Sequence, residues 1–154
     1  MARLPHARQP GTPARRRSYE QAGRLLGLRK ADPVALAQAV EAGFAYAALE
    51  RFARCADLSV SLVAEAIRLP QRTLARRKAK GRLQPEESDR LLRTSQIFGR
   101  ALELFEGDRA AAKTWLGTPQ RALGGAVPLR FAATDVGARE VDDLIGRLEH
   151  GIPA

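Results

Sequence analysis

The sequence predicts an all-α fold, in which an N-terminal helix-turn-helix bundle is followed by a small helical C-terminal domain. Apolar residues recur at three- and four-residue steps along most of the chain, which is the spacing of amphipathic helices. No stretch of convincing length alternates apolar and polar residues as a half-buried strand would. Apolar residues make up 45% of the chain and aromatic residues only 5%. The core must therefore consist mainly of aliphatic side chains, which suits packed helices.

Composition divides the chain into three parts. Residues 1–17 combine prolines and arginines with few large apolar groups, so we expect a flexible basic tail. Residues 107–154 hold six basic and six acidic side chains, whereas residues 1–106 hold 20 basic and 11 acidic ones. We therefore expect one unit over 18–106 and a second over 107–154. The whole net charge of +9 lies outside the second unit.

Cap and breaker residues set the limits of the expected helices in the first unit. Pro33 can begin a helix that Gly43 ends, Ser59 is the expected N-cap of another, and Gly81 ends a third. The segments expected to be helical before Gly107 are 33–42, 44–56, 60–67, 70–78 and 86–106.

Two further helices are expected in the second unit. Asp108 is the expected N-cap of a helix that ends near Leu116, and an irregular segment with paired glycines follows. The last helix begins after Thr134 or Asp135, and Gly151 ends it. Its expected buried face consists of Val136, Val141, Leu144, Ile145 and Leu148.

Residues 60–79 match the spacing of a helix-turn-helix motif. Such a motif needs a small residue in its first helix and apolar residues after the turn and inside the second helix. Ala64, Leu69 and Leu74 occupy these positions. Arg68 stands at the turn position that is often glycine, which is a departure from the usual pattern.

The same region carries a concentrated positive charge. Seven basic residues and no acidic residue lie between positions 68 and 82, which is typical of a surface that binds a polyanion. Gln and Arg side chains suit base contacts, while Thr and Lys suit phosphates. The residues expected to contact DNA, on or near the exposed face of the second helix, are Gln71, Arg72, Thr73, Arg76, Arg77 and Lys78. The alternative is an ordinary helical hairpin with a solvated basic face.

No combination of residues predicts catalysis, a metal site or a cofactor. His6 lies in the expected tail and His150 at the end of the last helix, and neither has the spacing of a metal ligand. Gly124-Gly125 lacks the Lys-Ser or Lys-Thr of a phosphate loop. Cys55 is the only cysteine, and no apolar run approaches the roughly 20 residues of a membrane helix. We therefore expect a cytoplasmic protein with no membrane segment.

Two blocks of residues carry a resemblance to a known family. The first block consists of Thr73–Arg77, Gly81–Leu83 and Glu86–Leu91. The second block consists of Gly107-Asp108, Trp115-Leu116, Pro119, Ala122–Gly125, Pro128, Thr134, Gly137, Val141, Leu144-Ile145 and Arg147–Gly151. With these residues, the chain from 44 to 154 resembles the Xre/MbcA/ParS antitoxins, whose partners are RES-domain toxins. The first block is similar to the family's helix-turn-helix region, and the second, more specific block to its C-terminal toxin-binding domain.

The resemblance implies the antitoxin of a type II toxin–antitoxin pair. RES-domain toxins consume NAD or transfer a group from NAD to a target. Such an antitoxin would bind its toxin and obstruct the toxin's cofactor site with its last residues. It would also form a homodimer, with the helix at 86–106 as a candidate contributor, and bind operator DNA to regulate its own expression. The residues expected at the toxin interface are Arg139, Arg147, Glu149, His150, Gly151, Ile152, Pro153 and Ala154.

Several alternatives stay open at this point. A free-standing helix-turn-helix transcription regulator would share the basic segment, and its C-terminal half would only dimerise. A small enzyme would need an acid–base pair or a nucleophile, and the adjacent Asp142 and Asp143 point in different directions on a helix, so we expect them to be solvated. Gly137 early in a helix indicates close packing, either against this chain or against a partner.

Overall fold

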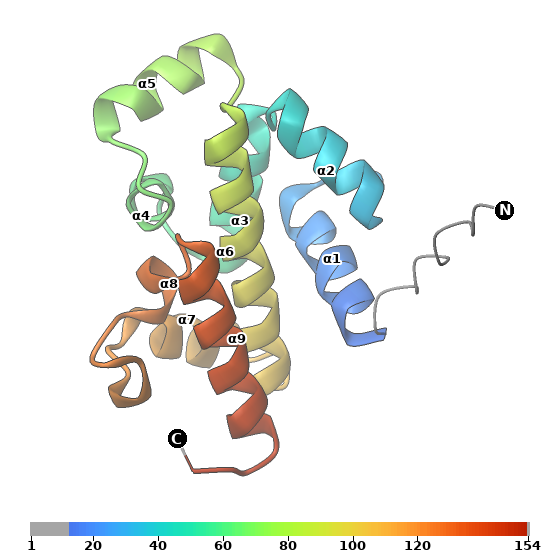
Figure 1. Ribbon diagram of the computed structural model, residues 1–154. Helices are drawn as coiled ribbons and strands as arrows, with labels where there is room; N and C mark the ends of the chain where they lie inside the picture. Colours follow the sequence, from blue (N-terminus) through green and yellow to red (C-terminus); the bar gives the residue numbers. More distant parts are fainter. Residues whose placement is uncertain (1–12, 154) are drawn as a thin grey trace, which may run out of the picture.

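The computed structural model describes residues 13–153, and these residues form nine α-helices, one short 3₁₀ helix and no strand. The prediction of an all-α fold is confirmed (Figure 1). The helices are α1 (Pro13–Leu26), α2 (Pro33–Ala42), α3 (Tyr46–Ala56), α4 (Val60–Ala66), α5 (Gln71–Lys80), α6 (Pro85–Leu104), α7 (Arg109–Gly117), α8 (Pro128–Phe131) and α9 (Asp135–Glu149), with the 3₁₀ helix η1 at Arg121–Leu123. None of the helices within 13–153 is long and apolar enough to span a membrane.

The predicted caps are the residues that begin and end the helices. The Ser59 hydroxyl accepts a hydrogen bond from the backbone N–H of Leu62 at 3.1 Å, at the start of α4. Asp108 caps α7 in the same way, and Thr134, rather than Asp135, caps α9. Gly81 ends α5 in the left-handed conformation that glycine adopts without strain. Local sequence therefore accounts for most helix limits.

Helix α6 runs through the middle of the molecule. It contacts α1, α2, α3, α7, α8 and α9, and ten of its 20 residues are buried. Figure 1 shows it as the long helix around which the others are placed. The other ten residues of α6 are at least partly exposed, so the expectation that this segment contributes to a dimer interface stays a prediction.

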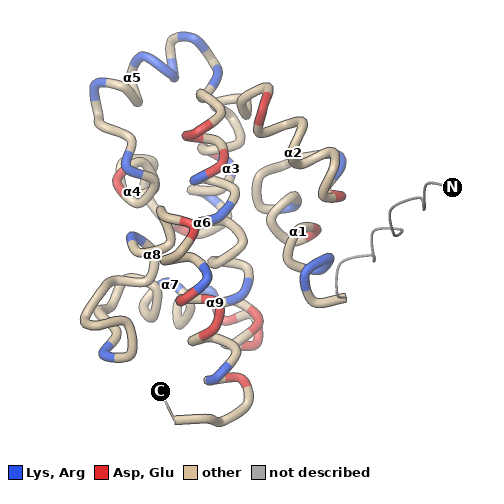
Figure 2. Tube along the Cα trace, in the orientation of Figure 1, with Lys and Arg blue, Asp and Glu red and all other residues tan. Residues whose placement is uncertain are grey.

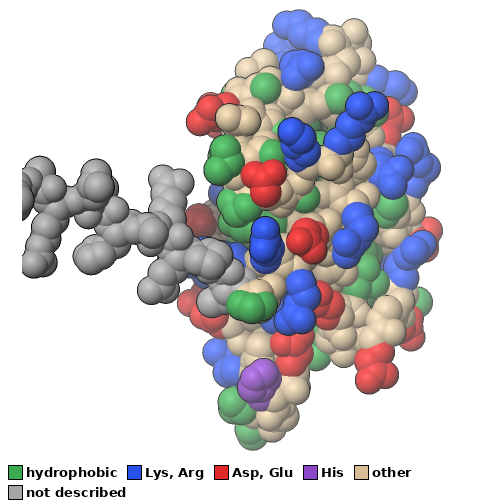
Figure 3. Space-filling view, turned by 90° about the vertical axis from the view of Figure 1, so that its right-hand side faces the viewer, with side chains coloured by type: hydrophobic (Ala, Val, Ile, Leu, Met, Phe, Trp, Pro, Cys, Tyr) green, Lys and Arg blue, Asp and Glu red, His purple; other side chains and the backbone are tan. Residues whose placement is uncertain are grey.

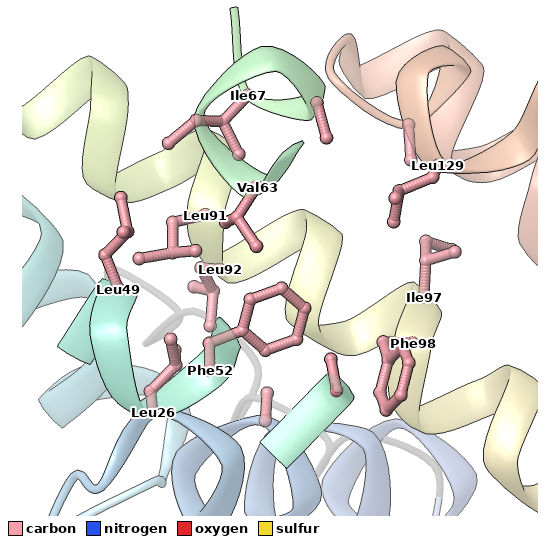
Figure 4. Close-up of a cluster of buried hydrophobic side chains, with 14 of the residues drawn as sticks. Leu26, Leu49, Phe52, Val63, Ile67, Leu91, Leu92, Ile97, Phe98 and Leu129 are labelled. Carbon is pink, nitrogen blue, oxygen red and sulfur yellow. The ribbon is translucent and has the colours of Figure 1, made fainter. Parts of the chain in front are cut away.

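A single hydrophobic core joins the two units expected from composition. Phe52 of α3 and Phe98 of α6 pack edge to face with ring centroids 5.7 Å apart. Figure 4 shows Leu26 and Leu49 on one side of this pair and Leu129 of α8 on the other. The core extends from Ala22 in α1 to Ile145 in α9, as one continuous cluster. The segments 18–106 and 107–154 therefore pack as parts of one structure.

Three expectations about individual segments are wrong. Residues 13–17 belong to α1 rather than to a tail, because this helix buries Ala22 and Leu26 against α3 and α6. The rest of the expected tail, 1–12, lies outside the described residues. Phe44 precedes α3 rather than belonging to it, and its carbonyl accepts from the N–H of Leu83 at 2.9 Å.

The third wrong expectation concerns the buried face of α9. Val136 is 70% exposed, whereas Val141, Leu144 and Ile145 are buried as expected. Val136 lies in the first turn of α9. The spacing of apolar residues includes this turn, but no other element covers the side chain there. Helical spacing alone therefore overestimates how much of α9 the core covers.

Gly137 packs against this chain itself. A Cβ atom built on it would lie 2.8 Å from the carbonyl carbon of Phe131 and closer still to the carbonyl oxygen. The loop that links α8 to α9 therefore turns directly over the first turn of α9. Gly146, on the same helix, has no neighbouring atom within 4 Å of an added Cβ.

We predict that Gly137→Ala destabilises the protein by about 2 kcal/mol, because the added methyl group must displace backbone. Gly146→Ala is the matched control on the same helix and stabilises by about 1 kcal/mol, because Ala has the higher helix propensity. Urea unfolding followed by circular dichroism measures both effects. Equal effects of the two substitutions would contradict the close packing at Gly137.

Candidate functional site

Helices α4 and α5 form the helix-turn-helix that the spacing predicts. The residues proposed to hold the two helices together, Ala64, Leu69 and Leu74, are all buried. The N–H of Leu69 donates to the carbonyl of Ala64 at 2.8 Å and closes the turn after α4. The turn therefore has the structure that its three apolar positions indicate.

Arg68 explains why this turn position is often glycine. Its φ is +57°, which lies in the left-handed region that a residue with a Cβ atom enters at a cost of about 1–2 kcal/mol. Glycine would adopt the same backbone conformation without that cost. The departure in the sequence thus leaves the motif intact and places a strained arginine on its surface.

Helix α5 presents nearly all of its surface to solvent. Leu74 is its only buried residue, and the helix contains no acidic side chain. Figure 2 shows its Lys and Arg residues along the top of the molecule, and the uppermost side chains in Figure 3 are also basic. Within residues 13–153, no ion pair involves the exposed basic group of the motif, which consists of Arg68, Arg72, Arg76, Lys78 and Lys80. We refer to these five residues as the basic surface.

Two further residues nominated for DNA contact lie beside the basic surface. Gln71 is exposed at the first position of α5, and its Oε1 accepts from the Ser61 hydroxyl at 3.1 Å. Thr73 is half-buried on the same turn. The structure thus brings Gln71, Arg72, Arg76 and Lys78 to one exposed helix, and Thr73 to its edge.

Arg77 does not share the exposed face on which it was expected. Its guanidinium forms a fork with the Glu87 carboxylate, with Nε at 2.8 Å from Oε2 and one terminal nitrogen at 2.9 Å from Oε1. The side chains of Arg77 and Glu87 are only 12% and 8% exposed. The expectation that Arg77 lies on the exposed face with the other contacts is therefore wrong, because the side chain turns inward to a partner on α6.

Glu87 holds two elements at once. Its Oε2 also accepts from the backbone N–H of Gln84 at 2.8 Å, at the N-terminal end of α6. Burial alone would raise the pKa of Glu87, but the hydrogen bonds from Arg77 and Gln84 and the charges of Arg77 and Arg90 outweigh burial. The pKa of Glu87 is therefore lowered from its ordinary value of 4.5, so the carboxylate stays ionised.

The turn of the motif is tied to α6 by a second contact. Arg90 Nε donates to the carbonyl oxygen of Ile67, the residue that ends α4, at 2.6 Å. This hydrogen bond satisfies a carbonyl that the helix itself leaves without a partner. Arg90 and Glu87 lie one turn apart on α6, so the start of this helix supports both the turn and α5.

The C-terminal unit is joined to α6 through Arg100. Its guanidinium contacts Asp142 at 2.8 Å, Glu103 at 3.0 Å and Glu149 at 3.0 Å. These carboxylates raise the pKa of Arg100 further above its ordinary value although burial opposes the shift. Asp142 and Asp143 are exposed as expected, and Asp142 also belongs to this cluster because α9 packs beside α6.

The residues nominated for a toxin interface lie at two places on α9 and beyond it. Arg139 is exposed and pairs with Asp135 one turn earlier on the same helix. Glu149 forms an ion pair with Arg100, and Arg147, two residues earlier, is half-buried. About 15 Å of helix separates Arg139 from the C-terminal group, so these residues do not form a single cluster.

After α9 the chain turns sharply. The N–H of Ile152 donates to the carbonyl of Arg147 at 2.9 Å, and Gly151 takes the left-handed conformation, with φ of +65°. His150 and Pro153 are exposed, and Ile152 is 51% exposed. Ala154 lies outside the described residues. The turn directs an apolar side chain away from the core.

Among residues 13–153 there is no group of three or more His, Cys, Asp or Glu side chains that could hold a metal ion. His6 lies outside the described residues. A cleft of about 400 Å³ opens between α1, α6 and α9. The two carboxylates that line it, Asp135 and Asp142, are paired with arginines of the same cleft.

Sequence reasoning missed Glu87, Arg90 and Arg100, the three charged residues through which α6 organises both surfaces. Glu87 stands three residues after Gln84, the spacing of a capping box, and this signal was available. Nothing local indicates that Arg77 would pair with it, or that Arg90 and Arg100 would reach Ile67 and α9, because these contacts depend on how the helices pack.

Two family models match successive segments of the chain. Residues 35–93 match the model of the antitoxin Xre-like helix-turn-helix domain. Residues 100–151 match the model of the antitoxin Xre/MbcA/ParS C-terminal toxin-binding domain. The two matches are separated only by residues 94–99, which lie inside α6.

Three curated relatives carry the name Antitoxin Xre. The protein from Yersinia enterocolitica is 37% identical over 130 residues, which cover 84% of this chain and 88% of the relative. The protein from Photorhabdus laumondii is 40% identical over 82 residues, 53% of this chain and 55% of the relative. The protein from Pseudomonas putida is 32% identical over 84 residues, 54% of this chain and 52% of the relative.

We predict that Arg68→Gly stabilises the protein by about 1 kcal/mol, because glycine removes the strain of the left-handed turn. The matched control is Arg72→Gly, four residues later inside α5, which destabilises by about 1 kcal/mol through lost helix propensity. Thermal unfolding of both variants tests the difference in sign. A loss of stability in Arg68→Gly would show that the arginine makes contacts that outweigh its strain.

We predict that Glu87→Gln lowers the free energy of unfolding by about 3 kcal/mol at pH 7, because it leaves Arg77 without its buried partner. A carboxylate with a lowered pKa stabilises the fold above pH 4.5 and loses this effect as the pH falls through its folded-state pKa. The difference in the free energy of unfolding between wild type and Glu87→Gln should therefore shrink as the pH falls below 4.5. Urea unfolding between pH 7 and pH 3 measures it, with the exposed neighbour Glu86→Gln as control.

Proposed function

The chain belongs to the Antitoxin Xre family, and from this premise we propose that it neutralises a cognate toxin by direct binding and binds DNA through α5. The observation that carries this proposal is the match of residues 100–151 to a C-terminal toxin-binding domain, in a chain that covers 88% of the Yersinia enterocolitica antitoxin. The helix-turn-helix match over 35–93 supports the second activity. Both activities are binding activities and need no catalytic group.

The toxin that we propose is a RES-domain protein that consumes NAD or transfers a group from it. The resemblance of the second sequence block supports this choice of partner. We propose that residues 150–154 obstruct the toxin's cofactor site while exposed side chains of α9 such as Arg139 hold the complex together. The exposed Ile152 favours this arrangement, because an apolar side chain directed away from its own core gains free energy when a partner covers it.

The DNA that we propose is the operator of the protein's own gene pair. We propose that the basic surface contacts phosphates and that Gln71, exposed at the start of α5, contacts a base. A two-fold homodimer would present two such motifs to a palindromic operator. The partly exposed residues of α6 remain candidates for the dimer contact.

Two measurements test the toxin proposal directly. Cellular NAD and growth are followed when the gene adjacent to this one is expressed alone and together with this protein. The proposal expects NAD to collapse with the toxin alone and to recover on co-expression. A toxin that stays active beside the folded protein would favour the free-standing transcription regulator, whose C-terminal half would only dimerise.

We predict that Arg72→Ala and Arg76→Ala each weaken binding to operator DNA and leave toxin neutralisation unchanged. Each variant removes one exposed cation without an ion-pair partner among the described residues, so the slope of log K against log salt should fall by about 0.9. Fluorescence anisotropy over a salt series measures the slope. Loss of neutralisation by a folded variant would contradict the division into two binding surfaces.

We predict that deletion of residues 152–154 weakens toxin inhibition and leaves DNA binding unchanged. The deletion ends the chain after Gly151, so α9 and its contacts with Arg100 are kept. Inhibition is measured as NAD turnover by the purified toxin at increasing antitoxin concentration. Full inhibition by the shortened protein would exclude obstruction by the tail.

A further inference from the structure

Helix α5, the element proposed to enter a DNA groove, is joined to the rest of the molecule by few side-chain contacts. Its one buried side chain is Leu74, near the middle of the helix. The first turn is held by the contact between Ser61 and Gln71, which is exposed to solvent. Beyond Leu74, the only side-chain hydrogen bond or ion pair within the described residues that joins α5 to the rest of the molecule is the fork between Arg77 and Glu87.

This fork has the geometry of a rigid connection. Two parallel hydrogen bonds of 2.8 and 2.9 Å restrain the guanidinium plane as well as its position. Glu87 is itself fixed by the backbone N–H of Gln84 and belongs to the buried side of α6. The C-terminal half of α5 is thereby set relative to the most extensively packed helix of the molecule.

We propose that Arg77 and Glu87 are positioning residues for DNA binding: their ion pair sets the angle at which α5 presents the basic surface, and neither residue contacts DNA. The inference rests on the proposed DNA binding by α5. It removes Arg77 from the expected DNA contacts and adds an acidic residue on which binding depends.

If the charge of Glu87 acted on DNA only through its electric field, Glu87→Gln would change DNA affinity in the opposite direction. Removing one negative charge near a polyanion strengthens binding if the charge acts only through its field. If Glu87 acts by holding Arg77, neutralising it weakens binding although the net charge of the protein rises. Arg77→Lys separates the alternatives at the other partner, because Lys keeps a charge for phosphate but loses the fork.

The experiment uses the full chain and a DNA duplex selected by the wild-type protein from a random 20-base-pair pool. Dissociation constants are measured over a salt series for Glu87→Gln, Arg77→Lys and the exposed control Glu86→Gln. We expect both pair variants to bind about tenfold more weakly with an unchanged salt slope, because the number of phosphate contacts stays the same. Glu86→Gln should bind as tightly as wild type or more tightly.

Toxin binding by the same variants provides the control for folding, since the toxin-binding domain lies at the other end of α6. Both pair variants should bind toxin as wild type does. If Glu87→Gln fails to fold, Arg77→Lys carries the test alone. Unchanged or tighter DNA binding by either folded variant would overturn the proposal, because a direct phosphate contact by residue 77 would survive the change to Lys. If no duplex is selected, or if Arg72→Ala binds like wild type, the proposed DNA binding itself fails.

Discussion

The burial of α6 is the constraint on which the rest of this structure depends. A helix of 20 residues spans about 30 Å, which is close to the diameter of a small domain. Six other helices pack against it, and its own apolar residues Leu91, Ile97 and Phe98 form the middle of the core. Because so much of one helix is enclosed, the positions of the elements around it are determined mainly by where they meet α6.

Polar residues on α6 give this packing its specificity. Glu87 reaches α5, Arg90 reaches the turn after α4, Arg93 donates to the carbonyl of Ala133, and Arg100 reaches α9. Burying charged groups is costly unless each has a partner. Here each of the four has at least one, so the hydrogen-bonding groups favour one arrangement of the helices over others that would bury the same apolar surface.

The two proposed binding surfaces lie at opposite ends of this helix. Helix α5 lies at the top of Figure 1 and the C-terminal segment at the bottom. The first turn of α6 supports the former through Glu87, and its last turns support the latter through Arg100. DNA and a toxin bound at these two places would therefore occupy separate surfaces of one continuous core.

The parts of the structure that depend on neighbouring residues could be predicted from the sequence. Ser59, Asp108 and Thr134 cap helices because the cap and the N–H groups that it satisfies are three residues apart. The helix-turn-helix was predictable because the two helices are close in sequence and pack through Ala64, Leu69 and Leu74. The exposure of the basic surface follows from composition, because arginine and lysine side chains are seldom buried without a partner of opposite charge.

The sequence by itself therefore determined the helices, the motif and the charge of α5. Only the tertiary structure decided that Arg77 turns inward to Glu87, that Glu149 is occupied by Arg100, and that Val136 is exposed. Periodicity tells which residues share a face of a helix, but not which helix or solvent that face meets. That choice depends on contacts between residues far apart in the chain, and such contacts form only when the whole core packs around α6.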